Sequence, residues 1–118
     1  MKGLVTTMEE RFFFDTHEII FVNMKKDGPE YVNLPASTIT SIVIAPHTYK
    51  KLLGLIKKEE RAITIQSTLR SDALFMAEHE DPRFEKYMTQ LKEFAAKNYI
   101  SLRDSTDEMA SKAEDGEQ

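Results

Sequence analysis

His79, Glu80 and Asp81 stand next to one another, and all three are residue types that can bind a metal ion or exchange protons. The ligands of a metal ion must converge on one point, whereas consecutive side chains in a strand or loop point in different directions. Asp81 followed by Pro82 is instead typical of a helix start, with aspartate as the N-cap and proline at the first helical position. We therefore predict that Asp81 caps a helix and that no metal binds here.

The densest group of basic side chains lies between residues 50 and 61, where leucine and isoleucine separate the charges. Each cation held near an anionic membrane would add about 1 kcal/mol to binding. Glu59 and Glu60 lie among them and would weaken that field, so a solvated strand or loop with paired charges is the alternative interpretation. The candidate ligand-binding residues are Lys50, Lys51, Lys57, Lys58 and Arg61.

Motifs that would indicate catalysis are missing from the sequence. There is no cysteine, which excludes thiolate catalysis, disulfides and zinc–thiolate sites. There is also no nucleophilic serine motif, phosphate-cradling glycine loop or His-Glu-x-x-His pattern. His17 and His47 stand alone in segments that we predict to be turns. We expect a protein that is not an enzyme and that uses no cofactor.

The net charge of −4 is unevenly distributed along the 118 residues. Residues 103–118 carry two basic and six acidic side chains, which leaves fourteen of each in residues 1–102. A nearly neutral body argues against nucleic-acid binding, which relies on an excess of lysine and arginine. We predict one domain over residues 1–102, followed by an acidic, disordered tail over residues 103–118.

No apolar run in the sequence reaches the roughly 18 residues that a membrane-spanning helix requires. The first ten residues also lack the apolar stretch of a secretory signal peptide. Together with the absence of cysteine, these features lead us to expect a cytoplasmic protein.

Aromatic and β-branched residues, broken by turn residues, predict a series of strands. A hairpin is expected over residues 11–24 with its turn at 15–17, and a second turn at Asp27-Gly28. Further strands are expected at 30–34, at 37–46 between two prolines, at 61–68, and at 72–79 as the last strand. Residues 47–60 fit either an amphipathic helix or a strand and hairpin. We favour the hairpin because Gly54 would cost about 1 kcal/mol inside a helix.

One amphipathic helix is predicted over residues 82–98, where apolar side chains recur at spacings of three and one. Its stripe consists of Phe84, Tyr87, Met88, Leu91, Phe94 and Ala95. Asn98 is the predicted C-cap, because asparagine tolerates the left-handed conformation that ends many helices.

The three phenylalanines at positions 12 to 14 cannot share one face of a strand. We expect Phe12 and Phe14 in the core and Phe13 on the opposite side. An exposed Phe13 is the one sequence feature that indicates contact between copies of the chain.

This order of elements predicts an α+β, mainly β, fold. We expect a strongly bent antiparallel sheet or partly open barrel of about seven strands, capped by one C-terminal amphipathic helix. The order resembles that of bacterial pleckstrin-homology-like (PH-like) domains over about residues 9–102. The resemblance rests on the stretches RFFFDTHEIIFVN, LPASTITSIVI, GLIKKEERAITIQ and DPRFEKYMTQLKEFAAK.

The resemblance implies a binding module, because relatives bind phosphoinositides, peptides or other proteins. Our leading hypothesis is a non-enzymatic binding or scaffolding module that acts through protein contacts, including self-association into a homo-oligomer. The alternative is a peripheral binder of anionic lipid or a phosphate ligand through the cluster from Lys50 to Arg61. In lipid-binding relatives the first hairpin carries basic residues, whereas its turn here is Asp15-Thr16-His17.

Overall fold

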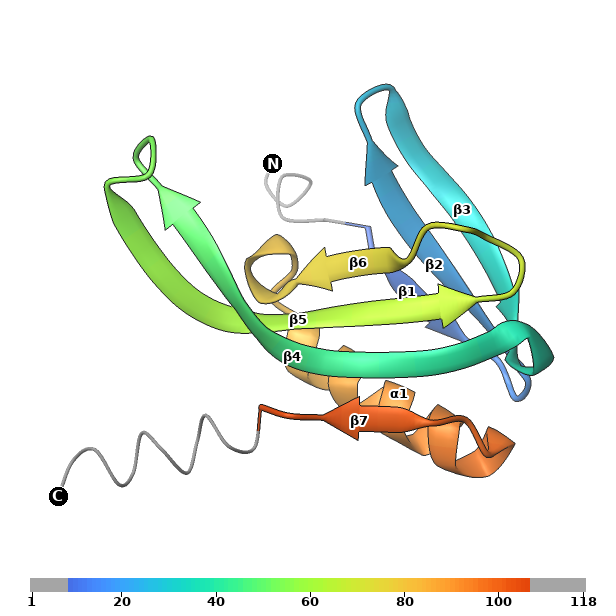
Figure 1. Cartoon of the computed structure of the whole chain (residues 1–118). Helices are drawn as coiled ribbons and strands as arrows, with labels where there is room; N and C mark the ends of the chain where they lie inside the picture. Colours follow the sequence, from blue (N-terminus) through green and yellow to red (C-terminus); the bar gives the residue numbers. More distant parts are fainter. Residues whose placement is uncertain (1–8, 107–118) are drawn as a thin grey trace, which may run out of the picture.

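The computed structural model describes residues 9–106 and shows two β-sheets with one helix packed against them (Figure 1). The predicted fold class, mainly β with one C-terminal helix, is confirmed, but the strands form two sheets instead of one bent sheet, and no closed barrel is present in the described residues. The first sheet has the order β1-β2-β3, and the second has the order β6-β5-β4-β7. The strands are β1 (Phe12–Phe14), β2 (Glu18–Lys25), β3 (Gly28–Pro35), β4 (Ile39–Lys51), β5 (Ile56–Ser67), β6 (Leu74–Ala77) and β7 (Leu102–Asp104).

Two hairpins build the first sheet, as predicted. Phe12 pairs with Phe21 between β1 and β2, and Phe21 pairs in turn with Val32 of β3. The turn between β2 and β3 consists of Lys26-Asp27, one residue before the predicted Asp27-Gly28, and Gly28 begins β3 with a φ of 129°, a conformation that favours glycine. Phe12 is 2% exposed and Phe13 41% exposed, so the expected division of the phenylalanines between two faces is confirmed.

The second sheet contains a long antiparallel hairpin that settles the ambiguous segment 47–60. β4 and β5 pair from Ile39 and Ser67 out to Lys51 and Ile56, so this segment is strand, turn and strand. The predicted strand end at Pro46 is wrong, because β4 continues through it and places His47 within the strand instead of in a turn. β7 pairs with β4 only at Ile42–Ile44, so Pro46 lies where the outer edge of β4 needs no backbone donor.

Helix α1 (Phe84–Asn98) buries all six residues of the predicted apolar stripe. These side chains join residues from both sheets in one core, which includes Phe12, Ile19, Leu34, Ile42, Ile63, Met76 and Leu91. Each such side chain contributes about 1.5 to 3 kcal/mol when it is fully buried. The helix therefore holds the two sheets together.

The helix ends at Asn98, as predicted, but it begins two residues later than expected, and both cap residues differ from the prediction. The N-cap is Arg83, not Asp81, and the left-handed residue at the C-terminus is Tyr99, with φ 57° and ψ 42°, not Asn98. Asn98 instead donates from its side chain to the carbonyls of Thr16 and Phe94. The Asn98 amide therefore binds the turn between β1 and β2, and Tyr99 takes the left-handed conformation that ends the helix.

A short strand, which we did not predict from the sequence, follows the helix. β7 runs parallel to β4, so β6 is not the last strand, and the predicted domain boundary after residue 102 falls inside β7. Three residues with mixed polarity give too short a pattern to predict a strand. The rest of the predicted tail, residues 107–118, lies outside the described residues.

Replacing Tyr99 by glycine should stabilise the protein. A non-glycine residue in the left-handed region costs roughly 1 kcal/mol, and the Tyr99 side chain, 96% exposed, contributes little packing in return. We expect Tyr99→Gly to raise the thermal midpoint by about 5 °C, measured by circular dichroism. Tyr99→Ala is the matched control, because it removes the ring and keeps the strain. An equal gain in both variants would contradict the explanation.

Candidate functional site

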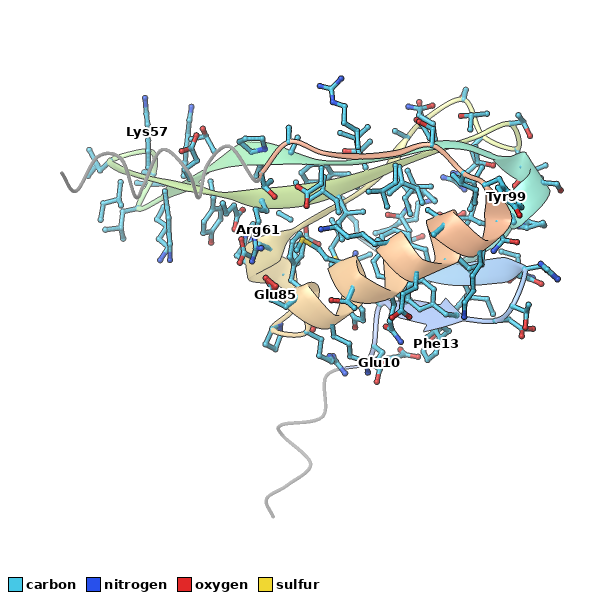
Figure 2. The ribbon with its side chains drawn as sticks, turned by 90° about the horizontal axis from the view of Figure 1, so that it is seen from below. Glu10, Phe13, Lys57, Arg61, Glu85 and Tyr99 are labelled. Carbon is cyan, nitrogen blue, oxygen red and sulfur yellow. The ribbon has the colours of Figure 1, made fainter. Side chains whose placement is uncertain are left out.

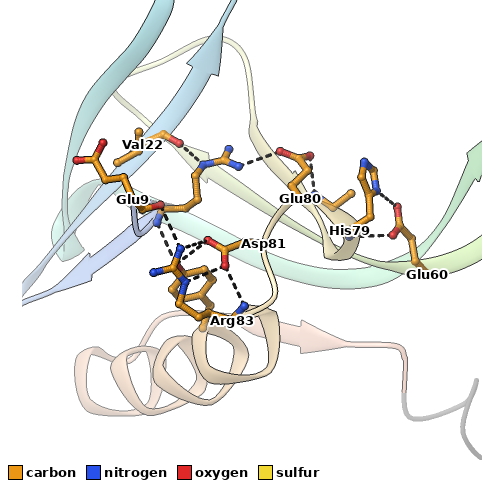
Figure 3. A network of polar contacts seen from close by, with 10 residues as sticks. Glu9, Val22, Glu60, His79, Glu80, Asp81 and Arg83 are labelled. Atoms are coloured by element: carbon orange, nitrogen blue, oxygen red, sulfur yellow. Dashed lines mark hydrogen bonds and ion pairs between the residues drawn. The ribbon is translucent and has the colours of Figure 1, made fainter. Parts of the chain in front are cut away.

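His79, Glu80 and Asp81 point to three different partners, as expected for consecutive residues (Figure 3). His79 Nδ1 lies 2.6 Å from Oε2 of Glu60, a residue of β5. Glu80 forms an ion pair with Arg11 at 2.9 Å, and Asp81 accepts hydrogen bonds from Arg83. Across residues 9–106 no group of three or more histidine, aspartate or glutamate side chains is arranged to hold a metal ion.

Asp81 is a fully buried carboxylate that connects three parts of the chain. It accepts hydrogen bonds from the backbone and guanidinium of Arg83, each at 2.9 Å to Oδ1, and from the Tyr87 hydroxyl at 2.9 Å to Oδ2. The Tyr87 oxygen in turn accepts the backbone N–H of Arg11 at 3.0 Å. Asp81 thus fixes the start of α1 against the entry to β1, which is a larger role than the predicted cap.

Two pKa values reflect this network. Burial raises the pKa of Asp81, but hydrogen bonds from Arg83 and Tyr87 outweigh the burial and leave it below its ordinary value. Burial, together with the bond to Asp81, raises the pKa of Tyr87 to about 12. The carboxylate therefore stays charged and the phenol stays protonated at neutral pH.

Arg61 forms a clamp between β5, the turn before α1 and α1 itself. Its guanidinium lies 2.7 Å from Oε2 of Glu78 and 2.9 Å from Oε2 of Glu85. It also lies 5.4 Å from the ring centroid of Phe84. Figure 2 shows Arg61 beside Glu85 near the start of the helix, far from Lys57. The structure therefore separates Arg61 from the four lysines with which the sequence grouped it.

The four lysines surround the end of the β4–β5 hairpin, which extends beyond the rest of the molecule (Figure 1). Lys50 of β4 pairs with Lys57 of β5. On either side of this pair, Tyr49 pairs with Lys58, and Lys51 pairs with Ile56. Because side chains alternate along a strand, Lys50 and Lys57 lie on one face of the ribbon and Lys51 and Lys58 on the other. Residues 50–59 are all exposed. Both faces of the hairpin end are therefore cationic.

The turn of this hairpin carries exposed apolar side chains, and we call residues 50–58 the hairpin tip. Leu53 is 103% exposed, and the other large apolar residues of the turn are also open to solvent: Leu52 (65%), Leu55 (85%) and Ile56 (47%). From the sequence, we interpreted these residues as separating the charges of the cluster or as part of an amphipathic helix. The available signal was Leu-Leu-Gly-Leu at a turn, where polar residues are usual.

The backbone of the hairpin tip is strained by its own sequence. Leu52 and Leu53 have φ values of 52° and 58°, and the Gly54 N–H donates to the Lys51 carbonyl at 3.1 Å. Gly54, with a φ of 88°, is suited to such a conformation, whereas bulky residues at positive φ cost about 1 kcal/mol or more each. Directly opposed lysines, as at Lys50 and Lys57, are also unfavourable. Folding alone does not explain these residue types.

A hollow of about 300 Å³ lies at the base of the hairpin tip. Lys51 and Lys58 line it together with Tyr49, whose ring stacks on His79 with centroids 3.7 Å apart. Of the three carboxylates in its wall, Glu60 contacts His79, Glu78 contacts Arg61, and Glu59 is exposed. The hollow is therefore lined by both basic and acidic side chains.

No family model, curated protein or solved structure matches the chain. Within residues 9–106 no helix is long and apolar enough to cross a membrane.

Replacing Asp81 by asparagine should destabilise the protein in a pH-dependent way. The change leaves Arg83 and Tyr87 without their charged acceptor, so we expect a loss of about 1 to 3 kcal/mol at pH 7. The folded pKa of Asp81 lies below the unfolded value of about 3.9, so its contribution is present above that pH and is lost as the pH falls through the folded pKa. Urea unfolding should show the gap to wild type narrowing below about pH 4.

Asp72→Asn is the control for this experiment, because Asp72 is exposed in the loop before β6. It should have the same free energy of unfolding as wild type at pH 3 and at pH 7. A gap for Asp81→Asn that is the same at pH 3 and pH 7 would mean that the charge of Asp81 does not contribute to stability.

Proposed function

We propose that this chain is a PH-like module that attaches to the surface of anionic membranes through its hairpin tip. The observation that carries the proposal is the pair of exposed, strained leucines at the end of a hairpin that has lysines on both faces. The order of β1 to β6 followed by one packed helix supports the assignment to the PH-like class, whereas β7 after the helix departs from the order that we expected for that class.

The chemistry of the hairpin tip matches the layers of a bilayer surface. Leu52, Leu53 and Leu55 are at the extreme end and would enter the boundary between headgroups and acyl chains, about 5 to 10 Å deep. The lysines are one to three residues further back, at the level of the phosphates. Four cations near an anionic surface would contribute about 4 kcal/mol, reduced by the repulsion of the exposed Glu59, and each buried leucine would add to the binding energy.

A membrane suits the hairpin tip better than a folded protein partner does. The lysines point away from both faces of a two-stranded ribbon, so a single flat partner would contact only half of them. A membrane that surrounds the inserted end meets all four. If the module acts through protein contacts instead, which was the leading hypothesis from the sequence, no binding to lipid vesicles should be detected.

Two further parts of the proposal rest on the sequence. The body carries no motif for catalysis, which supports a module that acts by binding and not as an enzyme. The absence of cysteine suits a reducing compartment, and we place the module at the cytoplasmic face of a membrane.

Vesicle sedimentation tests the proposal directly. Wild type should bind vesicles of phosphatidylserine and phosphatidylcholine, and binding to phosphatidylcholine alone should be weaker. Lys57→Gln combined with Lys58→Gln should weaken binding by about thirty-fold, because two cations of about 1 kcal/mol each are lost. The matched control, Lys86→Gln with Lys97→Gln on α1, removes the same charge and should retain most of the binding.

Leu52→Asn combined with Leu53→Gly separates the function of the hairpin tip from its folding. Asparagine and glycine tolerate the positive φ of positions 52 and 53 better than leucine does, so the variant should be at least as stable as wild type while it loses vesicle binding. Unchanged binding by this variant, or equal losses in the two lysine pairs, would refute insertion of the hairpin tip.

A further inference from the structure

The first sheet has a second apolar face that lies outside the core. Val22 is 1% exposed but does not belong to the core cluster, whereas its neighbours Ile19 and Phe21 do. Alternation along the strands therefore puts Val22 on the outer face of the sheet. Phe13, Ile20, Met24, Pro29 and Tyr31 share that face by their pairing in the register. Three of them are large and exposed: Phe13 (41%), Met24 (56%) and Tyr31 (55%).

This outer face is hollow at one end and raised at the other. A cavity of about 350 Å³ lies at the Met24 end, lined by Glu9, Arg11, Val22, Met24, Pro29 and Glu80. At the other end Phe13 pairs with Ile20 and projects away from the second sheet (Figure 2). A second face of the same shape, turned end over end, would place its raised end over this hollow.

The charges along β2 are arranged in the same self-complementary way. Glu18, Ile20, Val22 and Met24 follow one another on the outer side of the strand, and Lys26 lies in the turn just after its end. The acidic and basic ends lie roughly 26 Å apart at 3.3 Å per residue. Neither Glu18 nor Lys26 forms an ion pair with another described residue. An antiparallel copy would bring each charge next to its opposite.

We propose that the outer face of the first sheet binds a second copy of this chain in an isologous, two-fold dimer. The two-fold axis lies between the first sheet of one copy and the first sheet of the other, at the level of Val22. With this axis, β2 of one copy runs antiparallel to β2 of the other. Phe13 and Ile20 of each copy lie over the hollow of the other, and Glu18 lies near Lys26 at both ends. Sheets pack face to face in this way about 10 Å apart.

The dimer interface and the hairpin tip use separate residues, so this inference does not depend on membrane binding. The assembly is tested here without lipid.

Sedimentation velocity of the full chain over a range of concentrations measures the assembly. Wild type should change from monomer to dimer as the concentration rises. Glu18→Lys places two lysines together at each end of the interface, and Lys26→Glu places two glutamates there. Each variant alone should raise the dimer dissociation constant by about ten-fold or more. Lys86→Glu on α1, a charge reversal away from the face, should dimerise like wild type.

Mixing the two variants gives the decisive result. A chain with Glu18→Lys and a chain with Lys26→Glu restore both ion pairs between them, so the mixture should dimerise where each variant alone stays monomeric. A wild type that is monomeric at the highest concentration would overturn the proposal, and so would a mixture that associates no better than its components.

Discussion

The buried carboxylate of Asp81 is the interaction on which the arrangement of this protein depends. It binds Arg83 and Tyr87, and the Tyr87 hydroxyl binds the backbone of Arg11 at the entry to β1. A buried charge is tolerated when it is hydrogen-bonded, so these groups stabilise one another. Since α1 packs into the core that both sheets share, fixing its first turn helps to hold the two sheets in place. The Arg61 clamp to Glu78 and Glu85 acts at the same junction, from the base of that hairpin.

Rigidity in the body and strain at the hairpin tip are complementary features. Side chains near the junction satisfy one another: Glu80 with Arg11, His79 with Glu60, and Asp81 with Arg83. In the hairpin tip, Leu52 and Leu53 occupy unfavourable backbone conformations and expose apolar surface. Sequences that violate local preferences in this way usually do so where function requires it. This contrast is the physical basis for our proposal that binding occurs at the hairpin tip and not at the cluster of titratable residues.

Much of the fold could be predicted, because alternation and the helical stripe report burial directly. The six buried residues of α1 and the split between Phe12 and Phe13 are examples. The missed features depend on contacts distant in sequence: β7 needs β4 beside it, and Asn98 is diverted from its capping role by Thr16. Arg61 was grouped with the lysines because sequence proximity cannot reveal Glu85, a residue of α1. The sequence of the leucines fits both a hairpin turn and the apolar face of an amphipathic helix. The pairing of β4 with β5 shows that they lie at the end of a hairpin.

The central claim is that Leu53 enters the membrane while the body remains in water. Since the sequence contains no cysteine, Leu53→Cys accepts a single environment-sensitive fluorophore, and Tyr99→Cys, which Figure 2 places at the opposite end of the molecule from Lys57, serves as its reference. On vesicles of phosphatidylserine and phosphatidylcholine, the emission of the dye at position 53 should shift to the blue and become accessible to quenchers in the acyl chains. The dye at position 99 should keep its emission in water. A dye at position 53 that stays in water on vesicles to which the protein is bound would contradict the account.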